Sequence, residues 1–215
     1  MNSEDFLQIP LSCFILFFLF SFVILNFHEI YSQELTERMI DICCTWGTEL
    51  KDGILTYNIK KGSSNDLEKI VNSAFSEWEK NLNNIQFKNI KNNKDADIEI
   101  KLENENTDQE GGKAVIYFDK RGFIENVEIS VSKSYNGLKL NRTIVEHITK
   151  HEIGHALGLG HSQFPNSLMS PTVNETVKQI SACEIDAVKD ANIWKFINNE
   201  KKPKMIKQNA YVCLN

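Results

Sequence analysis

The eleven residues from His151 to His161, HEIGHALGLGH, constrain the fold of this chain more than any other feature. Consecutive residues of an α-helix are about 100° apart, so His151 and His155 project from one face and their imidazoles can share a metal ion. Glu152 lies one step round the helix, where its carboxylate can take a proton from a water molecule at the metal's open position. The pattern predicts a helical zinc site with Glu152 as the general base.

A third histidine, His161, follows His155 after six residues. On a continuing helix it would point about 240° away, so the helix has to stop before it. Gly158 can end the helix, because glycine enters the left-handed conformation without a Cβ penalty. Three neutral imidazoles and one exchangeable water are typical of catalytic zinc, so we expect one Zn²⁺ held by His151, His155 and His161. The glycine and third histidine argue against a chance match in an ordinary helix.

Length and charge limit the classes of protein to which the chain can belong. Its 215 residues, 41% of them hydrophobic, suffice for one domain with a real core plus extensions. The net charge is −5 and no block of Lys or Arg occurs, so we expect no nucleic acid partner.

The amino terminus predicts contact with a membrane. Residues 6–27 carry no charge and are mostly Leu, Ile, Phe and Val. This apolar segment is long enough to span a bilayer as a helix. Glu4 and Asp5 replace the usual basic residues of a signal peptide, and no clear cleavage site follows. Residues 1–27 are therefore either a signal peptide or a membrane anchor. We expect the domain to be extracytoplasmic, anchored or secreted; a reversed anchor with a cytoplasmic domain is the alternative.

Cysteine usage is consistent with export. Cys13 lies in the apolar segment, which leaves Cys43, Cys44, Cys183 and Cys213 for two disulfides with three alternative pairings. The most attractive pairings tie the region of Cys43 and Cys44, and the tail at Cys213, back to the domain at Cys183. Free thiols in a reducing compartment remain the alternative.

Hydrophobic periodicity predicts a domain over residues 46–198, preceded by a connector at 28–45 that could form a short helix and followed by a tail at 199–215. Alternation predicts strands at Ile54–Ile59, Ile85–Ile90, Asp97–Leu102, Lys113–Phe118 and Val127–Ser132. Helical spacing predicts helices from about Asn65 to Leu82, over Arg142–Leu157 and from about Ala182 to Ile197. The last two have Thr143 with Glu146, and Ser181 with Glu184, as predicted capping boxes.

An acidic group at residues 103–110 and the single residue His147 are further candidates for metal binding. Glu103, Glu105, Asp108 and Glu110 could supply oxygen ligands to Ca²⁺, although a solvated acidic loop is the interpretation that we favour. His147 lies one helical turn before His151, too early to reach the same metal. We expect it at the surface or behind the ligands.

The stretch from about Leu55 to Phe196 resembles the catalytic domain of the matrixins, a group of metzincins that includes matrix metalloproteinases and microbial relatives. The resemblance rests on the zinc motif with Ser162 directly after it and on the sequence SLMSP from Ser167 to Pro171. The glycine-led stretch Gly111–Ala114 and the acidic start of the last helix at Glu184 add to it. A domain without long accessory modules is typical of minimal, microbial members.

This resemblance implies an α+β, zincin-like fold: a twisted five-stranded mixed sheet with three helices, an active-site helix and a following Met-turn. Met169 would form an apolar floor beneath the histidines. Substrate-binding residues would be Lys113, Ala114 and Val115 on the edge strand, together with Val173, where matrixins often have a tyrosine. The family's second, structural zinc is not expected, because residues 103–112 contain no histidine.

The resulting hypothesis is a monomeric, zinc-dependent endopeptidase that hydrolyses protein or peptide substrates through a zinc-activated water, with Glu152 as general base. The backbone from Lys113 to Ile116 would hold an extended substrate as an added strand. The family's inhibitory prosegment cysteine has no clear counterpart, and we do not expect Cys43 or Cys44 to block the zinc. The alternative is an inactive protease scaffold that serves as a cell-surface binding protein.

Overall fold

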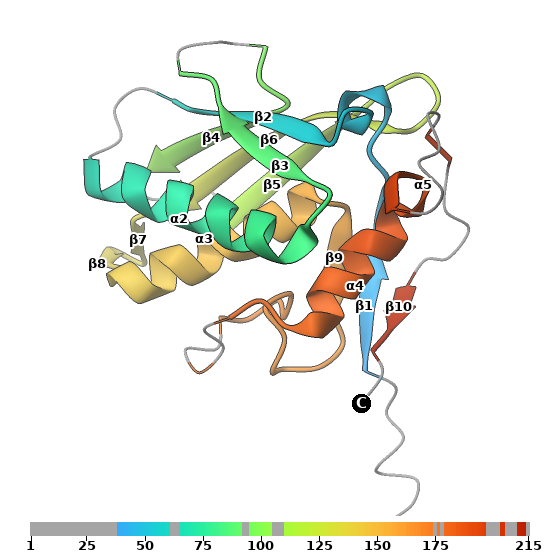
Figure 1. Cartoon of the computed structure of the whole chain (residues 1–215). Helices are drawn as coiled ribbons and strands as arrows, with labels where there is room; N and C mark the ends of the chain where they lie inside the picture. Colours follow the sequence, from blue (N-terminus) through green and yellow to red (C-terminus); the bar gives the residue numbers. More distant parts are fainter. Residues whose placement is uncertain are drawn as a thin grey trace, which may run out of the picture. The chain divides into compact units, whose positions relative to one another are not determined.

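The computed structural model describes residues 38–60, 65–91, 95–104, 110–173, 176, 179–196, 203–204 and 210–213 (Figure 1). The apolar segment 6–27 lies outside these residues. Among the described residues, no helix is long and apolar enough to cross a bilayer. The elements, in chain order, are β1 (Met39–Ile42), the 3-10 helix η1 (Thr48–Leu50), β2 (Ile54–Ile59), α2 (Asn65–Leu82), β3 (Gln86–Asn89), β4 (Ile98–Glu103), β5 (Gly112–Phe118), β6 (Ile124–Ser132), β7 (Ser134–Tyr135), β8 (Leu138–Lys139), α3 (Arg142–Ala156), β9 (Leu159–Ser162), α4 (Ala182–Ala191), α5 (Ile193–Phe196) and β10 (Ala210–Val212).

A five-stranded mixed sheet forms the centre of the domain, in the order β3-β2-β4-β6-β5. The first four strands are parallel, and β5 runs antiparallel to β6 at the edge. Helices α2 and α3 lie side by side across one face (Figure 1). The strands have one apolar face for the helices to cover, as β4 illustrates. Ile98 and Ile100 are buried, whereas Lys101, which lies between Ile100 and Leu102, is exposed. The predicted α+β fold is confirmed, with α2, α3 and α4 as its main helices.

Helix α2 packs through the apolar face that its periodicity predicts. Its buried residues are Ile70, Val71, Ala74, Phe75, Trp78 and Leu82. The Trp78 indole N–H donates to the Lys150 carbonyl of α3 at 3.0 Å, so a buried polar atom is satisfied where the two helices meet. This contact fixes α2 against the helix that carries the histidine motif.

Two predicted details differ in the structure and one is confirmed. Met39–Ile42, expected within a short helix, forms strand β1 instead. The capping box at Thr143 and Glu146 is wrong, because Asn141 caps α3 by accepting the N–H of Ile144 at 2.9 Å. The box at Ser181 and Glu184 is confirmed.

The last predicted helix is divided into α4 and α5 by Asn192. The Asn192 side chain is fully buried, and its amide makes three hydrogen bonds. Its Oδ1 accepts the N–H of Trp46 at 3.0 Å, and its Nδ2 donates to the carbonyls of Leu157 and Val188 at 2.9 and 3.1 Å. The break in the helix therefore connects the end of α4 to the end of α3.

A second sheet, in the order β10-β1-β9, joins segments from both ends of the described chain. Strand β1 is antiparallel to both neighbours. Cys183 in α4 forms a disulfide with Cys213 directly after β10, whereas Cys43 pairs with its neighbour Cys44. Of the predicted links, the one between Cys213 and Cys183 is present, and Cys43 and Cys44 are not tied to Cys183.

The turn after α3 gives a direct test of this packing. Gly158 has φ +100°, and a Cβ there would lie 2.3 Å from the Cys44 carbonyl oxygen. We expect Gly158→Ala to lower the free energy of unfolding by about 3 kcal/mol or more, since backbone strain and a backbone clash add. Urea denaturation measures the loss.

Gly137→Ala is the matched control. Gly137 also has positive φ, +74°, but no atom lies within 4 Å of its Cβ position. It should therefore show strain alone, about 1 kcal/mol. Equal losses of unfolding free energy in the two variants would show that the close approach of Gly158 to Cys44 does not contribute to the effect.

Candidate metal centre and active site

Two elements and one turn bring the predicted zinc ligands together. His151 and His155 lie one turn apart on α3, and Gly158 then turns the chain into β9, which carries His161. One ligand atom from each imidazole can be chosen so that all three lie within 4.8 Å of one another. The three side chains are therefore positioned to bind a single metal ion, as the motif predicts.

Backbone carbonyls orient two of the rings. The Nδ1 atom of His151 lies 2.7 Å from the Leu168 carbonyl, and that of His155 lies 2.8 Å from the Leu159 carbonyl. A carbonyl only accepts, so each Nδ1 carries the proton and each Nε2 keeps its lone pair. This tautomer leaves Nε2 as the ligand atom, as is usual where a second hydrogen bond orients a metal-binding histidine.

Burial keeps these histidines neutral. It lowers the pKa of His151 to about 3, with a further contribution from the neighbouring His155. Burial also lowers the pKa of His155, and His161 adds to that effect. Neutral imidazole is the form that binds metal, so the site needs no deprotonation of these two ligands at neutral pH.

Glu152 is buried beneath the start of the edge strand β5. A Cβ on Gly112 would lie only 2.5 Å from the Glu152 Oε1 atom, so glycine is required for this approach. Burial, with a smaller contribution from Glu110, raises the pKa of Glu152 to about 8. A carboxyl group poised in this range beside a metal site is suited to proton transfer.

The turn containing Met169 supports the histidines from below. Met169 is fully buried, and its Sδ atom lies 2.5 Å from the position that a Cβ on Gly154 would occupy. Gly154 immediately precedes His155, so the methionine packs directly under the ligand-bearing turn of α3. This placement agrees with the predicted Met-turn.

Glu184 fixes this turn, a role beyond the helix capping predicted for it. Its Oε1 accepts the Ser167 hydroxyl at 2.6 Å and the Leu168 N–H at 2.9 Å. Its Oε2 accepts the Ser181 N–H and hydroxyl. Because the Leu168 carbonyl orients His151, Glu184 acts on a ligand through one residue, Leu168. An acidic residue at the start of the last helix is the only sequence signal for this role.

A cavity of about 890 Å³ surrounds the three histidines and Glu152. Of the predicted substrate-binding residues, Lys113, Ala114 and Val173 line it, whereas Val115 is exposed and does not. His147 also lines the cavity and is buried, so of its two expected positions the surface one is wrong, and the one behind the ligands stays a prediction. The cavity wall also contains residues that were not predicted from the sequence to line it: Cys43, Tyr135, Leu140 and Ile144.

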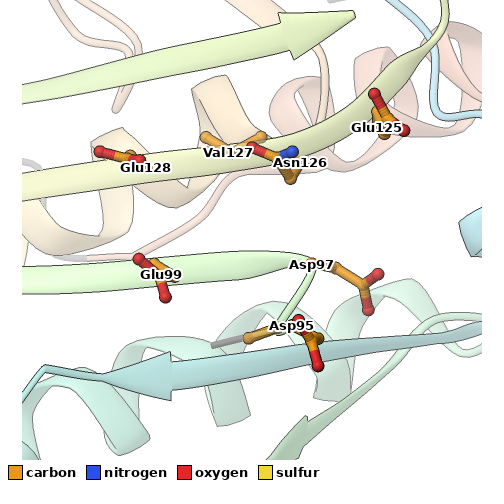
Figure 2. Close-up of a pocket in the computed structure, with 8 residues that line it drawn as sticks. Asp95, Asp97, Glu99, Glu125, Asn126, Val127 and Glu128 are labelled. Atoms are coloured by element: carbon orange, nitrogen blue, oxygen red, sulfur yellow. The ribbon is translucent and has the colours of Figure 1, made fainter. Parts of the chain in front are cut away.

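A smaller hollow of about 370 Å³ lies along β4 and β6 and is lined by carboxylates (Figure 2). Glu99 and Glu128 are paired across adjacent strands, and Lys60 neutralises Glu99 at 2.7 Å. Asp97 accepts the N–H and hydroxyl of Thr56, both at 2.6 Å. Asp97 and Glu99 thus have structural partners. The calcium prediction rests partly on Glu105 and Asp108, which lie outside the described residues.

Comparison with known proteins identifies a family for this chain. The matrixin model of the M10 peptidases matches residues 45–193. The curated proteins give no match. Among solved structures, myroilysin is similar over 66% of this chain and 80% of its own, at 13% identity and a TM-score of 0.45.

The buried carboxyl predicts an unusual dependence of stability on pH. Between pH 4.5 and about 8, folded Glu152 holds a proton that the unfolded chain has lost, so stability falls as pH rises. His151 has the opposite effect, because its unfolded form is protonated below pH 6.5 and its folded form only below about 3. From pH 6.5 to 8 the Glu152 effect should remain, at up to about 1.4 kcal/mol per pH unit.

Urea denaturation of the chelator-treated chain at pH 6.5 and 8 measures this slope. Glu152→Gln should remove most of it, because the amide does not titrate. An equal slope in the parent and the variant would contradict a raised pKa at Glu152.

Removing the Glu184 carboxylate should weaken the fold at the Met-turn. Glu184→Ala leaves the buried Ser167 hydroxyl and Leu168 N–H without their acceptor, at a cost of about 3 kcal/mol in stability. Asp186→Ala on the same helix is the control, because its ion pair with Lys189 is half exposed. It should change stability by less than about 0.5 kcal/mol. An equal fall of the unfolding temperature in both variants would contradict the role of Glu184.

Proposed function

The chain belongs to the matrixin family, and we propose that it is a zinc-dependent endopeptidase with Glu152 as its general base. The observation that supports this most directly is the convergence of His151, His155 and His161 beside a buried carboxyl group in one cavity. A structural zinc site would be closed by four protein ligands, whereas three histidines leave a position for water and substrate.

The donor set fits zinc. Imidazole nitrogen is a ligand that Zn²⁺ prefers, and the Nδ1 contacts to Leu168 and Leu159 fix His151 and His155 for binding through Nε2. When bound, the ion would supply a Lewis acid that polarises the scissile carbonyl and makes a water molecule more acidic.

Glu152 would move the protons of the reaction. Its carboxylate takes a proton from the attacking water and passes it to the nitrogen of the leaving amine. Burial alone keeps this group protonated at neutral pH, since its pKa is about 8. A nearby divalent cation favours the ionised form, so Glu152 becomes a base under the conditions in which the site is complete.

The edge strand β5 supports binding of an extended peptide. Among the strands that the structure describes, β5 is paired on one side only, with β6, and its residues Lys113 and Ala114 line the cavity. A substrate could add to the free side as a further strand, in the cavity that Val173 also lines. This arrangement supports protein or peptide substrates as the class acted upon.

We also propose that the domain is extracytoplasmic, and is either anchored to the membrane or secreted. The disulfide between Cys183 and Cys213 supports an oxidising compartment, because such bonds are rare in reducing ones. The apolar residues 6–27 supply the route of export.

Replacing the proposed base tests the mechanism. Glu152→Gln should bind zinc as the parent does but lose at least about 100-fold in kcat/KM on casein or gelatin, because proton transfer is lost. Removing zinc with a chelator should abolish parent activity, and added zinc should restore it.

Glu146→Gln, on the same helix but outside the cavity lining, is the matched control and should stay within a few-fold of the parent. Full activity in Glu152→Gln would contradict its role as base. A zinc-loaded parent that cleaves no peptide bond would favour the inactive binding scaffold instead.

A further inference from the structure

We infer that the C-terminal strand β10 and the disulfide Cys183–Cys213 position the third metal ligand, by fixing the strand β1 against which His161 is held. The inference rests on the proposed function, since it takes His161 as a ligand. The two strands concerned, β1 and β10, lie outside residues 45–193, which the family model matches.

His161 is held differently from the other two ligands. His151 and His155 belong to a helix of 15 residues, whereas His161 lies on a strand of four residues beyond the turn at Gly158. It is also exposed, so packing of its own ring contributes little to its position. The position of His161 therefore depends on the neighbours of the β9 backbone.

Strand β1 supplies most of these neighbours. It pairs with β9 through Ile40 opposite Ser162 and Ile42 opposite Leu159. Further hydrogen bonds extend the ladder at both ends, from the Cys43 N–H to the Gly158 carbonyl and from the Gln163 N–H to the Met39 carbonyl, both at 3.0 Å. His161 thus lies where the register shifts between these two pairs, in a segment that β1 holds on both sides, at Gly158 and at Gln163.

The other side of β1 is paired only with β10. Met39, Ile40 and Asp41 lie opposite Val212, Tyr211 and Ala210. The Cys213 N–H donates to the Arg38 carbonyl at 2.7 Å. Two strands alone are marginally stable in water, so the third strand contributes to keeping β1 and β9 paired.

Strand β10 has three residues and needs an anchor of its own. The disulfide provides it, since Cys213 follows β10 and Cys183 lies in the first turn of α4. Glu184, the next residue of that turn, holds the Met-turn that orients His151. The first turn of α4 therefore supports the metal site by two routes, one to His151 and one to His161.

The test compares zinc release from full-length variants that stay folded. Cys183→Ala/Cys213→Ala removes the anchor. Leu55→Ala, in the buried part of β2, is the control, because loss of a disulfide and truncation of a core leucine lower stability comparably. We expect the double variant to release Zn²⁺ to a chelator at least about ten-fold faster than the parent, as outer contacts of metal ligands typically affect affinity by 10–100-fold. Leu55→Ala should release it at the parent rate.

A pair of proline variants tests the strand itself with the disulfide intact. Ladder hydrogen bonds alternate along an antiparallel strand, so the Tyr211 N–H points toward β1 as that of Cys213 does, and the Val212 N–H points away. Tyr211→Pro should therefore speed zinc release, whereas Val212→Pro should not. The visible spectrum of the Co²⁺-substituted chain should change in Tyr211→Pro, because a displaced His161 alters the ligand geometry.

Amide exchange of Leu159–Ser162 in the metal-free chain tests the same link without an ion. It should be faster in the double variant and in Tyr211→Pro than in their controls. The inference would be overturned if zinc release and amide exchange in the double variant and in Tyr211→Pro matched those of the parent. It would also be overturned if Leu55→Ala accelerated both as much as the double variant does. A parent that binds zinc but cleaves nothing would overturn the proposed function alone.

Discussion

The metal site depends on the turn at Gly158, where α3 ends and the chain reverses toward His161. The last carbonyls of a helix have no partner within it. Here residues distant in sequence take them: the Trp46 indole N–H donates to Ala156, the Asn192 amide to Leu157 and the Cys43 N–H to Gly158. The close approach of the Cys44 carbonyl leaves room only for glycine. The end of α3 is thus fixed by tertiary contacts as well as by its own sequence.

A second close approach places the proposed base. Gly112 begins the edge strand directly against Glu152, so the strand expected to hold a substrate also covers the carboxyl group. Cover from this strand removes water, and loss of water is the main reason that the pKa of Glu152 rises. The edge strand therefore contributes to the burial that raises the pKa of Glu152.

The sequence predicted what depends on local spacing and missed what depends on pairing between distant segments. His151, His155 and Gly158 follow from helical geometry, and the strands of the main sheet follow from alternation. Strands β1 and β10 have four and three residues, too few for a period to be recognised, and their pairing joins residues more than 150 positions apart. At the start of α3, Asn141 and Thr143 are both good caps two residues apart, and propensity alone does not separate them. The second role of Glu184 likewise requires the Met-turn to be in place.

Burial also links metal binding to the protonation of the base. In the protein alone, low pKa values leave His151 and His155 neutral, and a high one leaves Glu152 protonated, so these three groups carry no charge at neutral pH. A divalent cation entering this site gains little from charge already present and is held by lone pairs on nitrogen. The charge of a bound ion would favour ionisation of the nearby carboxyl group, so metal binding would release a proton. In the proposed mechanism, the buried environment would therefore make Glu152 a base only when the metal is bound.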